Sequence, residues 1–282
     1  MSELSFQQVD VFTHVPLKGN PLAVVVDADG LSDETMASLA NWTNLSETTF
    51  LLKPTDPAAD YRARIFTPER ELPFAGHPTL GSCQVWLNSG RTPKQAQIVQ
   101  ECGAGLIRIR RDDKRLAFAA PPLRRGGDVD AETLTRLANG LRIKPNAIKA
   151  SQWVDNGPGW VAVMLESRAE VLALQPDYPA LADLKPGVVA PWLATDGDDA
   201  QFEVRAFIPT RAAEDPVTGS LNAGLAQWLI GAGLAPNAYV AAQGTVLGRA
   251  GRVHVERDGS DIWIGGRTIS CIEGKLQMPR GA

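Results

Sequence analysis

An internal repeat limits the folds open to this chain more than any other feature of its sequence. Two halves show the same order of elements at an offset of about 140 residues. Each half has an apolar strand, a helical segment, a second strand, a loop and an apolar helix. Phe66–Pro68 matches Phe207–Pro209, and His77–Gly81 matches Asp215–Gly219. The repeat predicts two similar units, with a chance likeness as the alternative because few positions match.

Around each apolar helix, the sequence predicts mostly antiparallel strands. Short β-type runs are separated by Gly or Asp turns, and Asp258-Gly259 is a hairpin signal. These runs are 98–101, 106–110, 116–119, 253–256, 262–264 and 269–272. Few helices alternate with them, which argues against a doubly wound parallel sheet. Pro121–Asp128 interrupts the periodicity, so we expect domains at 1–120 and 121–282, with the last strand able to pack back on the first domain.

Composition argues against several kinds of partner. The 282 residues carry a formal net charge of −4, which disfavours a nucleic acid or an anionic membrane as partner. Arg108, Arg110 and Arg111 are interleaved with Ile107 and Ile109, a pattern typical of the exposed face of a strand. The longest apolar runs are far too short to span a bilayer. The three cysteines form no metal-binding pattern, and with no signal peptide at the start we expect a cytoplasmic protein.

His77 and Asp215 carry the most obvious chemistry of the repeat. Proline is favoured at the first helical position, so Pro78 and Pro216 predict that His77 and Asp215 are N-caps of the apolar helices. A helix N-terminus offers N–H donors and partial positive charge, which suit a substrate carboxylate or a developing oxyanion. A purely structural cap is the alternative, and it is the commoner role of an Asp-Pro pair.

Glu47 lies in Asn44-Leu45-Ser46-Glu47, between a helical segment and an apolar strand. On this pattern alone, a surface or turn position is the commoner interpretation. Five segments nevertheless resemble, in family order, the signature segments of the phenazine-biosynthesis isomerase (PhzF-like) family. They are Gly19–Val25, Asn44–Phe50, Ile65–Pro78, Glu214–Ser220 and Gln243–Arg249. Together these matches extend over nearly the whole chain.

The resemblance implies an α+β fold of the diaminopimelate epimerase type. Two pseudo-symmetric lobes would each wrap a β-barrel-like, mostly antiparallel sheet around a central helix, with a cleft between the lobes. It also implies that Glu47 is the catalytic acid/base, and that His77 and Asp215 face each other in the cleft. The substrate-binding residues that it implies are Gly76, Gly219 and Ser220.

The positions of the cysteines favour isomerisation over racemisation. Diaminopimelate epimerase and proline racemase relatives place one cysteine at each helix start, where this chain has His77 and Asp215. A single carboxyl group can take a proton from one carbon and return it to another on the same face. We therefore expect a cofactor-independent isomerase of a small carboxylic acid, similar to the phenazine-pathway dihydro-hydroxyanthranilate isomerase. An amino-acid racemase or epimerase, and a non-catalytic small-molecule-binding protein on the same fold, are the alternatives.

Some further expectations concern the surroundings of Glu47 and the assembly. Burial beside Phe50 and Phe74 would raise the pKa of the Glu47 carboxyl above that of an ordinary glutamate. The resemblance implies no metal and no cofactor, and it suggests a homodimer. Four tryptophans are expected in the cores, with an interface as the alternative: Trp153, Trp160, Trp192 and Trp263.

Overall fold

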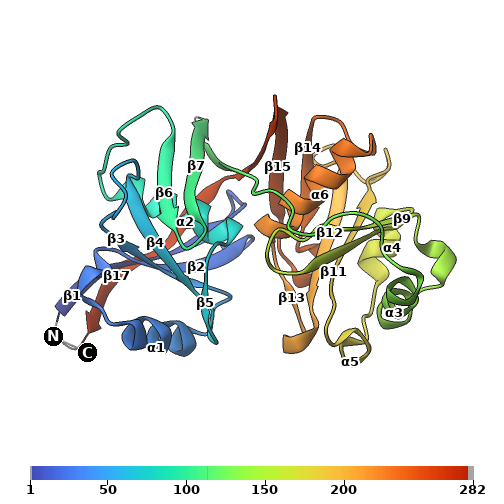
Figure 1. Ribbon diagram of the computed structural model, residues 1–282, viewed down its shortest axis with the longest axis horizontal. Helices are drawn as coiled ribbons and strands as arrows, with labels where there is room; N and C mark the ends of the chain where they lie inside the picture. The colour runs from blue at the N-terminus through green and yellow to red at the C-terminus, as the bar shows by residue number, and fades with distance from the viewer. Residues whose placement is uncertain (1, 113, 279–282) are drawn as a thin grey trace. The chain divides into compact units, whose positions relative to one another are not determined.

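The computed structural model describes residues 2–112 and 114–278, and their contacts divide the chain into two compact units (Figure 1). Unit 1 comprises the described residues of Met1–Ala119 and Gly265–Ala282, and unit 2 is Ala120–Ile264. The division lies beside the expected boundary after residue 120. At the end of the chain, β17 (Thr268–Met278) pairs antiparallel with β1 (Ser2–Val11), so the last strand packs back on the first unit, an arrangement for which the expected domain 121–282 allowed.

In unit 1 the strands form one continuous series of pairings. β2 (Asn20–Val25) is antiparallel to β1 and parallel to β3 (Thr48–Leu52), which is antiparallel to β4 (Tyr61–Phe66). β4 forms a hairpin with β5 (Glu71–Leu72) and is parallel to β6 (Ile98–Cys102). From β6 the sheet continues antiparallel through β7 (Gly105–Asp112) to β8 (Arg115–Ala119). Helix α1 (Asp33–Thr43) connects β2 with β3, and α2 (Gly76–Asn88) connects β5 with β6.

Unit 2 repeats this series in the same order. β9 (Ala150–Trp153) is antiparallel to β10 (Trp160–Met164), which is parallel to β11 (Lys185–Pro191). β11 is antiparallel to β12 (Phe202–Ile208), which forms a hairpin with β13 (Ala213–Asp215) and is parallel to β14 (Ala238–Gln243). β14 is antiparallel to β15 (Gly251–Asp258), and β16 is Asp261–Gly266. The helices are α3 (Ala131–Leu141), α4 (Arg168–Ala173), α5 (Tyr178–Leu181) and α6 (Gly219–Gly231).

The helices α2 and α6 are the central helices of their units. Ten of the thirteen residues of α2 and eleven of the thirteen of α6 are buried, as expected of a helix enclosed by its sheet. A glycine lets each helix approach the backbone or side chains beside it. A Cβ atom on Gly81 would lie 2.5 Å from Leu22 Cδ2, and one on Gly224 would lie 2.3 Å from the carbonyl oxygen of Val154.

The two hairpins repeat an ion pair as well as a backbone pattern. In β4–β5, Phe66 is opposite Glu71, and in β12–β13, Phe207 is opposite Glu214. Arg64 Nη2 lies 2.6 Å from Glu71 Oε2, and its guanidinium lies 5.1 Å from the centroid of the Phe66 ring. In the second hairpin, Arg205 Nη2 lies 2.8 Å from Glu214 Oε2, and the guanidinium lies 4.8 Å from the Phe207 ring.

These hairpins correct the predicted register of the repeat. Ile65 is opposite Leu72 in one hairpin, and Ala206 is opposite Asp215 in the other, so Asp215 corresponds to Leu72. The central helices begin at Gly76 and Gly219, so His77 corresponds to Ser220. The predicted match of His77 with Asp215 is wrong, because Asp215 ends a strand whereas His77 lies inside a helix.

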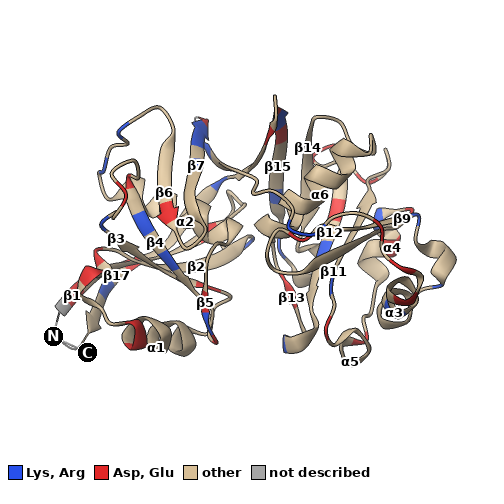
Figure 2. Cartoon of the chain, in the orientation of Figure 1, with Lys and Arg blue, Asp and Glu red and all other residues tan. Residues whose placement is uncertain are grey.

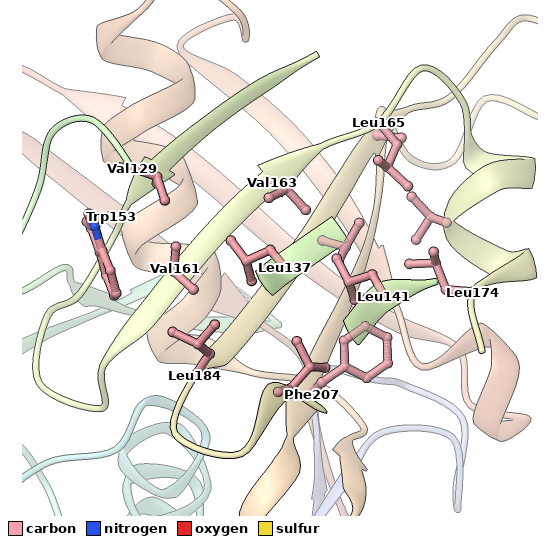
Figure 3. Packing of buried hydrophobic residues seen from close by; sticks show 14 residues of the cluster. Val129, Leu137, Leu141, Trp153, Val161, Val163, Leu165, Leu174, Leu184 and Phe207 are labelled. Carbon is pink, nitrogen blue, oxygen red and sulfur yellow. The ribbon is translucent and has the colours of Figure 1, made fainter. Parts of the chain in front are cut away.

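One hydrophobic cluster of unit 2 lies between α3 and the strands β10 to β12 (Figure 3). Leu137 and Leu141 of α3 point into a cluster that contains Val161, Val163 and Phe207.

The basic residues of β7, in unit 1, lie on the exposed face of the strand, as expected. Ile107 and Ile109 are buried while Arg108 is exposed, and Figure 2 shows the basic residues along this strand. Across the described residues, none of the helices is long and apolar enough to cross a membrane.

Candidate active site

Glu47 is held in a short connection between α1 and β3. Helix α1 ends at Thr43, and Asn44 takes a left-handed conformation with φ of 54°, a common way for a helix to stop. The hydroxyls of Thr43 and Thr48 then lie 3.0 Å apart and close the loop. Thr48 is buried at the start of β3, so the side chain of Glu47, 15% exposed, lies at the edge of the core.

His77 lies beside Glu47 in the first turn of α2. His77 Nε2 is 3.3 Å from Glu47 Oε2, and the imidazole is buried with 5% of its side chain exposed. The helix that carries it is tied to β3 by a hydrogen bond of 2.9 Å from the Ser82 hydroxyl to Thr49 Oγ1. The same helix is tied to β6, where Gln100 Nε2 donates to Thr79 Oγ1 over 3.1 Å. Glu47 and His77 are therefore brought together by two elements with fixed positions in the sheet.

The imidazole of His77 is neutral at ordinary pH. Burial disfavours the imidazolium and lowers the pKa of His77 to about 3. On its other side, Nδ1 of His77 lies 3.3 Å from Nδ2 of Asn20, the first residue of β2. A neutral imidazole beside a carboxylate can donate a hydrogen bond without becoming charged, and this is a useful property next to a group that gains and loses protons.

Asp215 lies in unit 2, at the end of β13, in a network centred on Gln243. The Thr218 hydroxyl donates to Asp215 Oδ2 over 2.5 Å, and Gln243 Nε2 donates to the Asp215 carbonyl oxygen over 3.1 Å. Gln243 Oε1 accepts from the Thr218 backbone N–H and from Asn222 Nδ2, at 3.0 and 2.9 Å. Gln243 is fully buried, so this network fixes the chain between β13 and α6.

Gly219 and Ser220 form the first turn of α6. Ser220 Oγ accepts a hydrogen bond of 3.0 Å from Trp160 Nε1, and the Ser220 carbonyl oxygen accepts one of 2.8 Å from Asn156 Nδ2. Because the Trp160 N–H occupies an acceptor position of the hydroxyl, the Ser220 O–H is left to donate. A donating hydroxyl at a helix N-terminus, next to the backbone of Gly219, suits a carboxylate.

The structure corrects the predicted caps at both helix starts. Helix α2 begins at Gly76 after Ala75, so His77 is its second residue rather than its N-cap. Helix α6 begins at Gly219 after Thr218, and Asp215 lies in the preceding strand. Proline can occupy any position of the first turn, where a missing N–H is tolerated, and this explains why Pro78 predicted a start later than the observed one.

Of the predicted site residues, Glu47, Gly76 and His77 lie in unit 1, and Asp215, Gly219 and Ser220 lie in unit 2. Within each unit the structure brings the predicted residues into one place. Sequence reasoning gave no role to the residues that orient them. These orienting residues are Asn20, Asn156, Trp160 and Gln243. Asn20 and Gln243 do lie in segments that resemble family signatures, which is the one signal that could have pointed to them.

The sequence profile of the family described as phenazine biosynthesis-like protein matches residues 9–274. The chain belongs to this phenazine biosynthesis-like family. The family resemblance and the predicted class of the protein, an enzyme that is an isomerase, are thereby confirmed, since relatives of this family are named as isomerases.

Two relatives and one solved structure show how far the likeness extends. Antisense-enhancing sequence 1 of Schizosaccharomyces pombe is 37% identical over 98% of this chain and 99% of its own length. The trans-2,3-dihydro-3-hydroxyanthranilate isomerase of Pseudomonas aeruginosa is 35% identical over 94% of this chain and 92% of its own. A phenazine biosynthesis family protein of Enterococcus faecalis superposes with a TM-score of 0.81, at 26% identity, over 98% of this chain and 100% of that chain. The predicted α+β fold is confirmed as that of the phenazine biosynthesis-like family.

Proposed function

We propose that this chain is a cofactor-independent isomerase that moves a proton within a small cyclic or amino carboxylic acid, with Glu47 as its general base and acid. The contact of 3.3 Å between Glu47 Oε2 and the buried His77 Nε2 carries the proposal. A carboxylate can remove a proton from carbon, and an adjacent neutral N–H donor keeps it in one orientation without competing for the proton. The relative named trans-2,3-dihydro-3-hydroxyanthranilate isomerase supports a substrate of that chemistry.

The first turn of α6 is proposed to bind the substrate carboxylate. The Gly219 backbone, the Ser220 hydroxyl and the helix N-terminus supply donors and partial positive charge. Gly76, which begins α2, is proposed to contribute backbone in the same way. Asp215, held by Thr218 and Gln243, is proposed to act with His77 on the charge that develops during proton transfer.

The cysteines disfavour a two-thiol racemase. Cys83 lies inside α2 rather than at its start, and burial raises the pKa of its thiol to about 12. A thiol with that pKa is almost entirely protonated at neutral pH and is a poor base. Cys102 is also buried, and burial raises the pKa of its thiol as well.

The experiment that tests the proposal follows trans-2,3-dihydro-3-hydroxyanthranilate by NMR in D₂O. Wild type should isomerise it with deuterium entering the product, and Glu47→Gln should be slower by about 10²–10⁴-fold, the usual contribution of a general acid–base group. Glu34→Gln removes an exposed carboxylate of α1 in the same unit and should react like wild type.

Two results would contradict the proposal in different ways. Full exchange by Glu47→Gln would remove Glu47 as the base, whatever the substrate is. No reaction of wild type would remove this substrate, and the same exchange assay on a panel of cyclic and α-amino acids would then decide between isomerisation and racemisation. The expected homodimer and cytoplasmic location stay predictions, and light scattering on the purified protein would test the first of them.

A further inference from the structure

Asn20 lies at the point of unit 1 where a buried amide contacts the imidazole of His77. It is fully buried as the first residue of β2, and its backbone is paired with Val11 of β1. The preceding residue, Gly19, donates its N–H to Asp10 Oδ2 over 2.9 Å. A Cβ atom at Gly19 would lie 2.2 Å from the Val11 carbonyl oxygen, so the backbone here is tightly packed. The position of the Asn20 amide is therefore fixed by the sheet.

The two contacts of His77 define where its single proton lies. Nδ2 of Asn20 is 3.3 Å from Nδ1, and an amide nitrogen can only donate, so Nδ1 must be the acceptor. A neutral imidazole carries one proton, which then lies on Nε2, the atom 3.3 Å from Glu47 Oε2. If the Asn20 amide were turned over, Nε2 would present a lone pair to the carboxylate, which is electrostatically unfavourable. Both sides of the ring favour the same tautomer.

We propose that Asn20 is a positioning residue that keeps the proton of His77 on Nε2, so that the ring presents an N–H and no lone pair to Glu47. The consequence concerns the proton that Glu47 takes up. An imidazole with Nε2–H has no lone pair towards Glu47, so the proton stays on the carboxyl until the substrate takes it back. This role rests on the proposed function, whereas the tautomer itself depends only on unit 1.

Unit 2 has an equivalent arrangement, in which a donor at the start of a strand contacts the central helix, with different side chains. Trp160 is the first residue of β10, as Asn20 is of β2, and its indole N–H donates to Ser220. Ser220 is the second residue of α6, as His77 is of α2. In each unit, an N–H donor at the start of a strand contacts an acceptor atom of the polar side chain in the first turn of the central helix. The proton of that side chain then points elsewhere.

The test is a long-range ¹H–¹⁵N NMR spectrum of uniformly ¹⁵N-labelled free protein, in which a protonated and an unprotonated ring nitrogen have clearly different shifts. The chain has three histidines, and His77→Gln assigns the His77 signals. Wild type should show an unprotonated Nδ1 and a protonated Nε2. Asn20→Asp replaces the donor with an acceptor of the same shape and should protonate Nδ1. Asn20→Leu removes the donor and should raise the share of the Nδ1-protonated tautomer above that of wild type, with Glu47 still favouring a proton on Nε2.

Asn41→Asp is the matched control, because it adds the same charge at an exposed position of unit 1 and should leave the His77 signals unchanged. A protonated Nδ1 in wild type, or an unchanged tautomer in a folded Asn20→Asp, would overturn the proposal. If Asn20→Asp does not fold, the wild-type spectrum and Asn20→Leu still decide. Failure of the proposed function is distinguishable, because it would leave this spectrum as predicted while Glu47→Gln retained activity.

Discussion

Glu214→Gln should destabilise the protein far more than Glu71→Gln, although each breaks the same Arg–Glu pair of the repeat. In unit 2, Arg205 and Glu214 are 5% and 4% exposed, and Arg205 Nη1 also donates to the carbonyl oxygens of Val171 and Leu174. In unit 1, Glu71 is 41% exposed. The pair in unit 2 also anchors β13, whose last residue is Asp215.

The difference in burial sets the expected magnitudes. Removing one partner of a buried pair leaves an uncompensated charge and costs about 3–5 kcal/mol. The amide that replaces the Glu214 carboxylate would keep one acceptor oxygen, so we expect the lower end of that range. An exposed pair contributes about 0–1 kcal/mol, and Arg64 keeps a second carboxylate partner in Asp33 at 2.5 Å. The two variants should therefore differ by about 2–3 kcal/mol in free energy of unfolding.

Hydrogen exchange followed by mass spectrometry measures this difference separately for peptides of each unit, which avoids assuming a single unfolding transition. Glu214→Gln should increase exchange in β12, β13 and α4, and Glu71→Gln should leave β4 and β5 close to wild type. The double variant Arg205→Met/Glu214→Leu should recover most of the loss, because no buried charge remains. Equal costs for the two single variants, or a double variant as unstable as Glu214→Gln, would refute this reasoning.

Three further predictions concern the site and its support. Burial lowers the pKa of His77 to about 3, against about 6.5 in the unfolded chain. The free energy of unfolding that the neutral ring allows is therefore fully present above about pH 6.5 and is lost as the pH falls towards 3. Urea unfolding of His77→Gln should depend less on pH over that range. Gly224→Ala should lower stability by about 1–3 kcal/mol because its Cβ would meet the Val154 carbonyl oxygen, whereas thermal unfolding of Gly231→Ala, with open space around the new Cβ, should show no loss. Trp160→Phe removes the hydrogen bond that orients the Ser220 hydroxyl and should raise KM about fivefold, which corresponds to the loss of one hydrogen bond. In a double-mutant cycle of kcat/KM, it should add nothing to the effect of Ser220→Ala.

Much of the fold could be predicted because the spacing of apolar residues is similar in the two halves of the repeat. The strands at 20–25, 61–66 and 202–208 and both central helices follow from apolar runs and turn residues. Helix α3 was not predicted, although Asp130 caps it by accepting from the Thr133 N–H and an apolar stripe follows. The proline- and glycine-rich segment Pro121–Asp128 directly before it interrupts the hydrophobic periodicity and masks the start of the helix.

The candidate site was predicted in its reacting groups but not in their orientation. Glu47 was named through a family motif, since its own pattern fits an ordinary turn. Trp160 was expected to be a core residue, and it is 2% exposed, but hydrophobic patterning carries no information about where its indole N–H points. The register error between His77 and Asp215 has the same origin. Pro78 lies in the first turn of α2, whereas Pro216 lies between β13 and α6, and only the strand pairing of β13 resolves this.

The pairing of β1 with β17 has a consequence for the order in which the chain folds during synthesis. Unit 2 is one continuous segment, Ala120–Ile264, so its synthesis is complete before Thr268 is added. In unit 1, β1 can pair with β2 early, but its other edge has no neighbour until β17, the last described strand, has been made. Domains usually complete their folding from the N-terminus onwards. In this protein unit 1 is synthesised in part before unit 2, but its sheet is completed only afterwards. One edge of β1 therefore stays unpaired while the whole of unit 2 is translated.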